Sequence, residues 1–95
     1  MKTIIYTTKF CSYCDMAKSL LKKREIDYQT IDVTDSPEKR KMLIQRSGGL
    51  KTVPQIFIDG RHIGGFDALQ KIDREGELEE LIQASKKSIN QINEK

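Results

Sequence analysis

Strand-like and helix-like segments alternate along most of this chain, and their order restricts the folds open to it. Runs of β-branched and aromatic residues, typical of strands, are found at residues 3–8, 28–33, 53–58 and 61–63. Helical spacing of apolar residues predicts helices at residues 11–24, 37–47, 67–75 and from 77 onward. The predicted order is therefore βαβαββαα, with no internal repeat or linker.

This order predicts how the strands pair. Two strands joined through a helix run parallel, with a right-handed crossover. Asp59-Gly60 is a hairpin signal, so the last two strands are expected to be antiparallel. The fold class is therefore α/β, with one four-stranded mixed sheet and helices on both of its faces.

Capping residues set the expected helix ends. Ser36 followed by Pro37 predicts a helix start, and Asp67 is expected to cap the third helix. Gly48-Gly49 and Gly76 are expected to end the helices that precede them.

Length and composition exclude several classes of protein. Ninety-five residues suit a single domain, and no apolar run approaches the roughly 18 residues of a membrane span. The N-terminal segment lacks the apolar core of a signal peptide, so we expect a cytoplasmic protein without a membrane partner. A net charge of +3, with only three tyrosines and three phenylalanines, favours small anionic ligands over nucleic acid.

The only two cysteines, Cys11 and Cys14, form a Cys-x-x-Cys pair at the junction of the first strand and the first helix. At a helix start, this spacing lets the two sulfurs bond. Unpaired N–H groups and the helix dipole favour a thiolate at Cys11, which lowers the pKa of such thiols to about 3.5–7.5. Lys9 adds a positive charge nearby, whereas Cys14 is expected to be more buried. One sulfur can therefore attack while the other resolves the mixed disulfide.

A zinc site and a chance pairing are the alternatives to redox chemistry at these cysteines. A protein-only zinc site normally needs four ligands, and the chain adds only the distant His62. Two core cysteines placed close together by chance would have to be buried, which the exposure of most strand-to-helix junctions disfavours.

Two longer segments carry a resemblance to a known family. They are YTTKFCSYC at residues 6–14 and RSGGLKTVPQIFIDGRHIGGFDAL at residues 46–69. With these, residues 3–82 resemble a dithiol glutaredoxin of the small bacterial type, in the thioredoxin-fold superfamily. The resemblance implies the thioredoxin/glutaredoxin fold and a glutathione-dependent thiol–disulfide oxidoreductase. Its expected substrates are glutathionylated proteins and proteins that contain disulfides, with glutathione as co-substrate.

The resemblance also implies a glutathione site. Val53-Pro54 resembles the family's cis-proline turn, where the Val53 backbone pairs with glutathione like an added strand. Backbone N–H groups of Phe66 and Asp67 would hold the γ-glutamyl carboxylate, and the Asp67 side chain would hold the ammonium group. Arg40 or Lys41 would reach the glycyl carboxylate. Beside the catalytic Cys11 and Cys14, the expected binding residues are Lys9, Tyr13, Thr52, Val53, Pro54, Gly65, Phe66 and Asp67.

The chain departs from the family's pattern in two places. Ser12 replaces the proline of the usual Cys-Pro-Tyr-Cys motif, and some members without this proline bind a [2Fe–2S] cluster between two protomers. A cluster held by Cys11 and glutathione in a dimer is therefore one alternative to a monomeric enzyme. An electron donor reduced by thioredoxin reductase is another.

The second departure is the C-terminus. Residues 1–84 are expected to form the domain, and residues 85–95 a helical extension or frayed tail with Ile89 and Ile92 on its apolar stripe.

Overall fold

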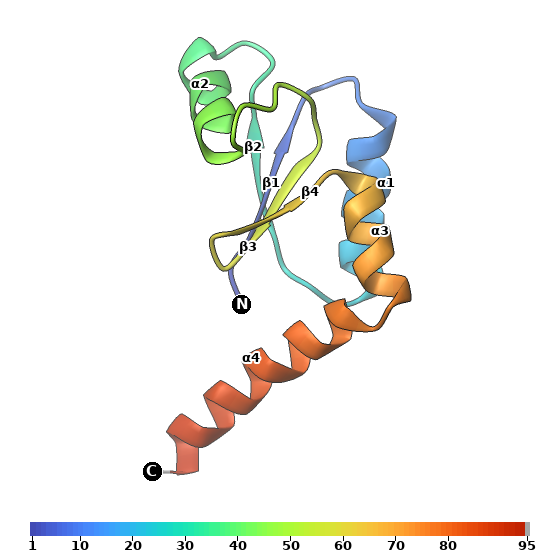
Figure 1. The fold of residues 1–95 in the computed structure, drawn as a ribbon, viewed down its shortest axis with the longest axis vertical. Coiled ribbons are helices and arrows are strands. Elements are labelled where there is room, and N and C mark those ends of the chain that lie inside the picture. Colours follow the sequence, from blue (N-terminus) through green and yellow to red (C-terminus); the bar gives the residue numbers. More distant parts are fainter. Residues whose placement is uncertain (95) are drawn as a thin grey trace.

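The computed structural model describes the backbone of residues 1–94 and the side chains of residues 1–86 (Figure 1). The strands are β1 (Thr3–Thr7), β2 (Gln29–Asp32), β3 (Gln55–Ile58) and β4 (Arg61–Gly64). The helices are α1 (Ser12–Lys23), α2 (Pro37–Arg46), α3 (Phe66–Arg74) and α4 (Glu77–Glu94). The predicted order βαβαββαα is confirmed.

The strands form one mixed sheet in the order β2-β1-β3-β4. β1 runs parallel to β2, with Ile5 opposite Thr30, and antiparallel to β3, with Ile5 opposite Ile56. β3 and β4 form the antiparallel hairpin that the Asp59-Gly60 turn predicted. The pairing of the strands is therefore as expected.

Both faces of the sheet are covered, because side chains alternate along β1 and β3. Figure 1 shows α1 and α3 on one side of the sheet and α2 on the other. One core cluster contains the side chains of Ile5, Ala17, Leu21, Ile26, Ile56, Ile58, Leu69 and Leu78. The other contains Tyr6, Val33, Leu43 and Phe57. Each fully buried aliphatic side chain contributes about 1.5–3 kcal/mol, so the two clusters together hold the layers in place.

The start of α2 is as predicted, but the start of α3 is not. Ser36 caps α2, and its hydroxyl accepts from the Lys39 N–H at 3.2 Å. Asp67 does not cap α3: the helix begins at Phe66, and Gly65 occupies the N-cap without a side-chain hydrogen bond. Asp67 instead lies in the first turn, where a negative charge is still favourable to the helix dipole.

Several element ends also differ from the expected ones. β1 and β2 are shorter than predicted by one or two residues, as is usual at element ends. β3 begins two residues late, at Gln55, because Pro54 has no N–H to donate to the ladder. The predicted stop of α2 at Gly48-Gly49 is confirmed: α2 ends at Arg46, Ser47 is its C-cap, and Gly48 follows with a φ of +76°.

Helix α4 begins on the core and continues away from the sheet, as the orange-to-red ribbon in Figure 1 shows. Leu78 is fully buried in the first core cluster, and Leu81 and Ile82 pack against it. The predicted apolar positions Ile89 and Ile92 lie outside the described side chains. The backbone helix is continuous through residues 84 and 85, so the proposed domain boundary there stays a prediction.

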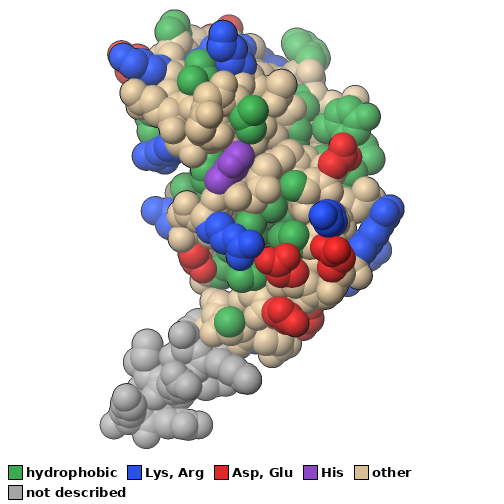
Figure 2. All heavy atoms as spheres, in the orientation of Figure 1, with side chains coloured by type: hydrophobic (Ala, Val, Ile, Leu, Met, Phe, Trp, Pro, Cys, Tyr) green, Lys and Arg blue, Asp and Glu red, His purple; other side chains and the backbone are tan. Residues whose placement is uncertain are grey.

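The surface carries charges of both signs. Figure 2 shows Lys and Arg side chains interspersed with Asp and Glu side chains over the face in view, with hydrophobic side chains between them. Across the part of the chain that the structure describes, no helix has the length and hydropathy to cross a membrane.

Candidate active site

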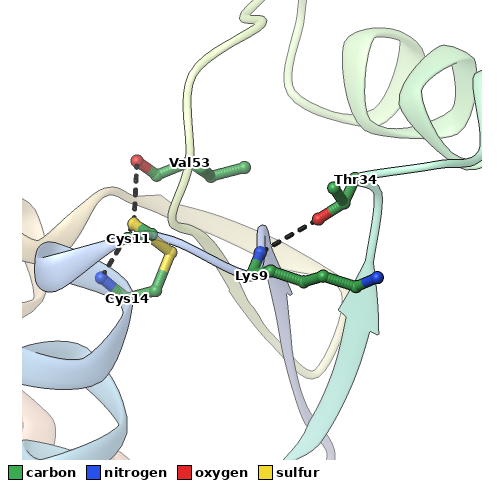
Figure 3. Close-up of a disulfide and its surroundings, with 5 residues drawn as sticks. All are labelled: Lys9, Cys11, Cys14, Thr34 and Val53. Carbon is green, nitrogen blue, oxygen red and sulfur yellow. Dashed lines mark hydrogen bonds between the residues drawn. A yellow bond between two sulfur atoms is a disulfide. The ribbon is translucent and has the colours of Figure 1, made fainter.

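Cys11 and Cys14 meet at the N-terminus of α1, where the chain leaves β1. Cys11 is the N-cap residue, in an extended conformation, and Cys14 lies in the first turn. The two form a disulfide with their Cα atoms 5.2 Å apart, inside the usual range for such bonds (Figure 3). The sequence-based pairing of these sulfurs is therefore present in the structure.

The two sulfurs differ in exposure and in hydrogen bonding. Cys14 is 1% exposed, whereas Cys11 is only partly buried. The Cys11 Sγ accepts a hydrogen bond from the Cys14 backbone N–H at 3.1 Å. That N–H belongs to the helix start, where the dipole also favours negative charge. The environment thus favours a thiolate at Cys11 in the reduced protein and leaves Cys14 shielded.

The sulfur of Cys11 also borders the loop that precedes β3. Its Sγ lies 3.9 Å from the carbonyl oxygen of Val53, the residue before the cis-proline (Figure 3). A disulfide sulfur has no hydrogen to donate, so in the oxidised form this is a close approach only. It places the backbone carbonyl of Val53 beside the Cys11 sulfur.

Lys9 is turned away from the sulfurs. Its ammonium group pairs with the Asp35 carboxylate at 3.2 Å, and Figure 3 shows the side chain extending away from the disulfide. Its backbone N–H donates to Thr34 Oγ1 at 2.9 Å, which ties the loop before Cys11 to the end of β2. The ion pair is exposed and worth about 0–1 kcal/mol, so it does not lock the side chain in place.

A cavity of about 370 Å³ is lined by Val53, the residue whose carbonyl oxygen lies near the Cys11 sulfur. It is lined by Tyr13, Thr52, Val53, Pro54, Gln55, Gly65, Phe66, Asp67 and Ala68. The start of α1, the cis-proline loop and the start of α3 therefore meet here. The predicted binding residues are brought together at this cavity, except for Lys9 and for Arg40 or Lys41.

Two aromatic rings form one wall of the cavity. The ring centroids of Tyr13 and Phe66 lie 6.3 Å apart with their planes tilted by 33°. Tyr13 is 59% exposed, so most of its surface is open to a ligand or a protein substrate. At the start of α3, the backbone N–H groups of Phe66 and Asp67 have no partner within the helix. They can hold an anionic group, and the exposed Asp67 carboxylate can hold a cation.

Sequence reasoning missed two of the lining residues, Gln55 and Ala68. Gln55 is 3% exposed although it is polar, and it follows directly after the cis-proline. A glutamine at the head of an otherwise apolar strand is the signal that marks it, because such a side chain must find partners when buried. Ala68 carries no comparable signal.

Arg40 and Lys41 do not line this cavity, and both are exposed on α2. Among the described residues, no three His, Cys, Asp or Glu side chains lie close enough together to hold a metal ion.

Known proteins are similar to this chain in sequence and in fold. The family model named Glutaredoxin matches residues 3–63. Glutaredoxin 1 of Rickettsia conorii is 44% identical over 86 residues, which cover 90% of this chain and 84% of the relative. Glutaredoxin 3 of Escherichia coli K12 is 45% identical over 78 residues, which cover 82% of this chain and 93% of the relative.

Among solved structures, the crystal structure of a buckwheat glutaredoxin–glutathione complex aligns with a TM-score of 0.77 at 30% identity. The alignment covers 86% of this chain and 76% of the buckwheat chain. The similarities in sequence and in fold thus point to the same family as the Cys-x-x-Cys pair does. The chain belongs to the glutaredoxin family of glutathione-dependent thiol–disulfide oxidoreductases.

Proposed function

We propose that Cys11 is the nucleophile of this enzyme and that it reduces protein–glutathione mixed disulfides. The observation that carries this role is the position of Cys11 Sγ: it is partly exposed, accepts the Cys14 N–H and lies 3.9 Å from Val53 at the edge of the cavity. The Cys11 thiolate attacks the glutathione sulfur of the substrate. The protein thiolate leaves and takes up a proton, and a Cys11–glutathione disulfide remains.

A second glutathione completes the cycle. Its thiolate attacks the glutathionyl sulfur on Cys11, forms oxidised glutathione and releases the Cys11 thiolate. With a protein disulfide as substrate, Cys11 forms a mixed disulfide with that protein. Cys14 then attacks Cys11 and releases the substrate as a dithiol, which leaves the Cys11–Cys14 disulfide found here. Two glutathione molecules return the enzyme to its reduced state.

The cavity is the proposed site of the glutathione portion of the substrate. The buckwheat relative was crystallised with glutathione, which supports the same ligand here. The Val53 backbone would pair with the cysteinyl part of glutathione. That part of the ligand would lie between the Thr52–Pro54 turn and the rings of Tyr13 and Phe66. The start of α3, after Gly65, would receive the γ-glutamyl carboxylate, and Asp67 would pair with the ammonium group. Specificity then comes from polar contacts along an open groove.

Lys9 is proposed to bind a glutathione carboxylate after leaving Asp35. The exposed pair is weak, so a carboxylate at the cavity edge can compete with Asp35 for the ammonium group. Either Arg40 or Lys41 is proposed to contact the glycyl carboxylate. We further propose that the enzyme is a monomer in a reducing cytoplasm, where a close cysteine pair is kept available as a dithiol.

The cluster alternative rests on Ser12 alone. One protomer offers a single accessible sulfur, Cys11, because Cys14 is buried. A [2Fe–2S] cluster would therefore need a second protomer and the thiolates of two glutathione molecules, which provide the four ligands such clusters take. Anaerobic reconstitution with iron, sulfide and glutathione tests this: a colourless monomer excludes the cluster, and a coloured dimer establishes it.

The function itself is tested by reduction of a small glutathione mixed disulfide, coupled to glutathione reductase. Wild type and Cys14→Ser are expected to be active, and Cys11→Ser inactive. On a protein disulfide, Cys14→Ser is expected to lose activity. Equal loss in both variants on the glutathione substrate contradicts the assigned roles. Activity only when thioredoxin reductase replaces glutathione establishes the electron-donor alternative.

A further inference from the structure

A chain of side-chain hydrogen bonds runs from the edge strand β4 to the cavity. His62 Nε2 lies 2.7 Å from Gln55 Oε1, and Gln55 Nε2 donates to Thr52 Oγ1 at 3.1 Å. Thr52 and Gln55 line the cavity, whereas His62 does not. The histidine can therefore act on the cavity only through its two partners.

The register of the sheet explains why these side chains meet. Gln55 and Phe57 lie on the same face of β3, because side chains alternate along a strand. Phe57 is opposite His62 on β4, and their ring centroids lie 4.9 Å apart with planes tilted by 30°. The ring of Phe57 thus packs against the imidazole of His62, which lies within hydrogen-bond distance of Gln55. Gln55 is 3% exposed, so loss of its partners would leave a buried amide unsatisfied.

The direction of the hydrogen bonds follows from the chemistry of the groups. Gln55 Oε1 has no hydrogen, so His62 Nε2 is the donor in this arrangement. The amide of Gln55 then turns its NH₂ toward Thr52, and Thr52 Oγ1 is the acceptor. A threonine hydroxyl has one hydrogen, which is left to donate to another group. Without a donor at residue 62, the Gln55 side-chain amide can rotate by half a turn. Its oxygen would then accept a hydrogen bond from the Thr52 hydroxyl, which would no longer be free to donate elsewhere.

We propose that His62 is a positioning residue for glutathione. Through Gln55 it keeps the Thr52 hydroxyl free to donate to an acceptor oxygen of glutathione, a carboxylate or a peptide carbonyl. This inference rests on the proposed function, because it needs glutathione to occupy the cavity. It assigns a role in substrate binding to a histidine that touches neither the substrate nor the sulfurs.

Steady-state kinetics on the glutathione mixed disulfide, with four full-length variants, tests the proposed role of the His62–Gln55–Thr52 hydrogen-bond chain. His62→Phe keeps a ring against Phe57 and removes the donor, whereas Thr52→Val keeps the shape and removes the hydroxyl. Each is expected to raise KM about five- to tenfold with kcat changed less than about twofold, the effect of one lost hydrogen bond to a charged or polar acceptor. The double variant is expected to resemble Thr52→Val alone, because both changes remove the same bond. His62→Gln keeps an N–H donor and is expected to hold KM within about twofold of wild type.

Three results in the variants that change His62 would overturn the inference. They are an unchanged KM in His62→Phe, a double variant whose KM rises by the product of the two single effects, and a His62→Gln variant no better than His62→Phe. If His62→Phe does not fold, Gln55→Met takes its place in the same cycle. An unchanged KM in Thr52→Val, with normal reduction by Cys14→Ser, contradicts the role proposed for His62 but not the proposed function. Failure of both wild type and Cys14→Ser to reduce the substrate contradicts the proposed function and the role of His62 together.

Discussion

The backbone N–H of Cys14 donates to the Sγ of Cys11 at 3.1 Å within the first turn of α1. The residue that we propose as the resolving cysteine thus donates a hydrogen bond to the sulfur that we propose as the nucleophile. Any change in the number of N–H groups at this helix start is expected to change how readily Cys11 forms a thiolate.

Ser12→Pro is expected to slow the alkylation of Cys11 by iodoacetamide. Ser12 is the first residue of α1, and proline there removes one N–H from the region that stabilises the thiolate. Loss of that one donor corresponds to about a two- to fivefold slower reaction near neutral pH. The measurement uses reduced Cys14→Ser protein, with and without Ser12→Pro, so that only Cys11 reacts. An unchanged or faster rate contradicts the prediction, and stability is expected to stay within about 1 kcal/mol because proline suits this position.

Asp67→Asn is expected to raise KM for the glutathione mixed disulfide about tenfold, as loss of a charged hydrogen bond to the ammonium group would do. The free energy of unfolding is expected to change by less than about 1 kcal/mol, because Gly65 rather than Asp67 occupies the N-cap of α3. Glu38→Gln is the matched control, since Glu38 is an acidic residue in the first turn of α2 and does not line the cavity. Equal effects of the two changes on KM would contradict a specific role for Asp67.

Asp32 is expected to make stability depend on pH. Hydrogen bonds from the Thr34 side chain and backbone N–H lower the pKa of the Asp32 carboxyl from its ordinary value of 3.8, with smaller help from Lys9. A lowered folded-state pKa stabilises the protein above the ordinary value, and this contribution is lost as pH falls through the folded-state pKa.

Asp32→Asn is therefore expected to be less stable than wild type near about pH 7, with the difference shrinking below the ordinary value of 3.8. Urea unfolding across this pH range measures the difference. A gap that stays constant down to the acid limit would show that the charge of Asp32 contributes nothing. Thr34 also accepts the Lys9 N–H, so the same change is expected to loosen the loop before Cys11.

The start of α4 is expected to matter for stability more than its end. Leu78 is fully buried against the first core cluster, so Leu78→Ala is expected to lower the free energy of unfolding by about 2–5 kcal/mol. Leu81 and Ile82 also precede residue 85. Removal of residues 85–95 is expected to cost less than about 1 kcal/mol, as is common for chain termini. A truncated protein as unstable as Leu78→Ala would contradict the division of the chain at residue 84.

The sequence predicted the element order and the sheet because both depend on local patterns. β-branched strands, the Asp59-Gly60 turn and the Ser36-Pro37 cap each determine a few neighbouring residues. The start of α3 was predicted wrongly because two good cap residues, Gly65 and Asp67, lie close together. Backbone geometry decides between them, with Gly64 at a φ of +123°, and the sequence does not reveal that geometry.

The candidate site was predicted through family resemblance, and the cavity unites nearly all of its residues. Lys9 is one exception, because its ion pair with Asp35 depends on where the end of β2 lies relative to the loop before Cys11. Gln55 was missed for a related reason. Its partners, Thr52 and His62, come from a loop and from another strand, so no local pattern reveals the network.

The central claim is that Cys11 carries glutathione, and intact-mass analysis tests it most directly. Reduced Cys14→Ser and Cys11→Ser proteins are each mixed with oxidised glutathione, and the adduct is located by peptide fragmentation. We expect one glutathionyl group on Cys11 in Cys14→Ser and none in Cys11→Ser, because Cys14 is 1% exposed. An adduct on Cys14 that forms as fast as the one on Cys11 would contradict the assignment of the nucleophile.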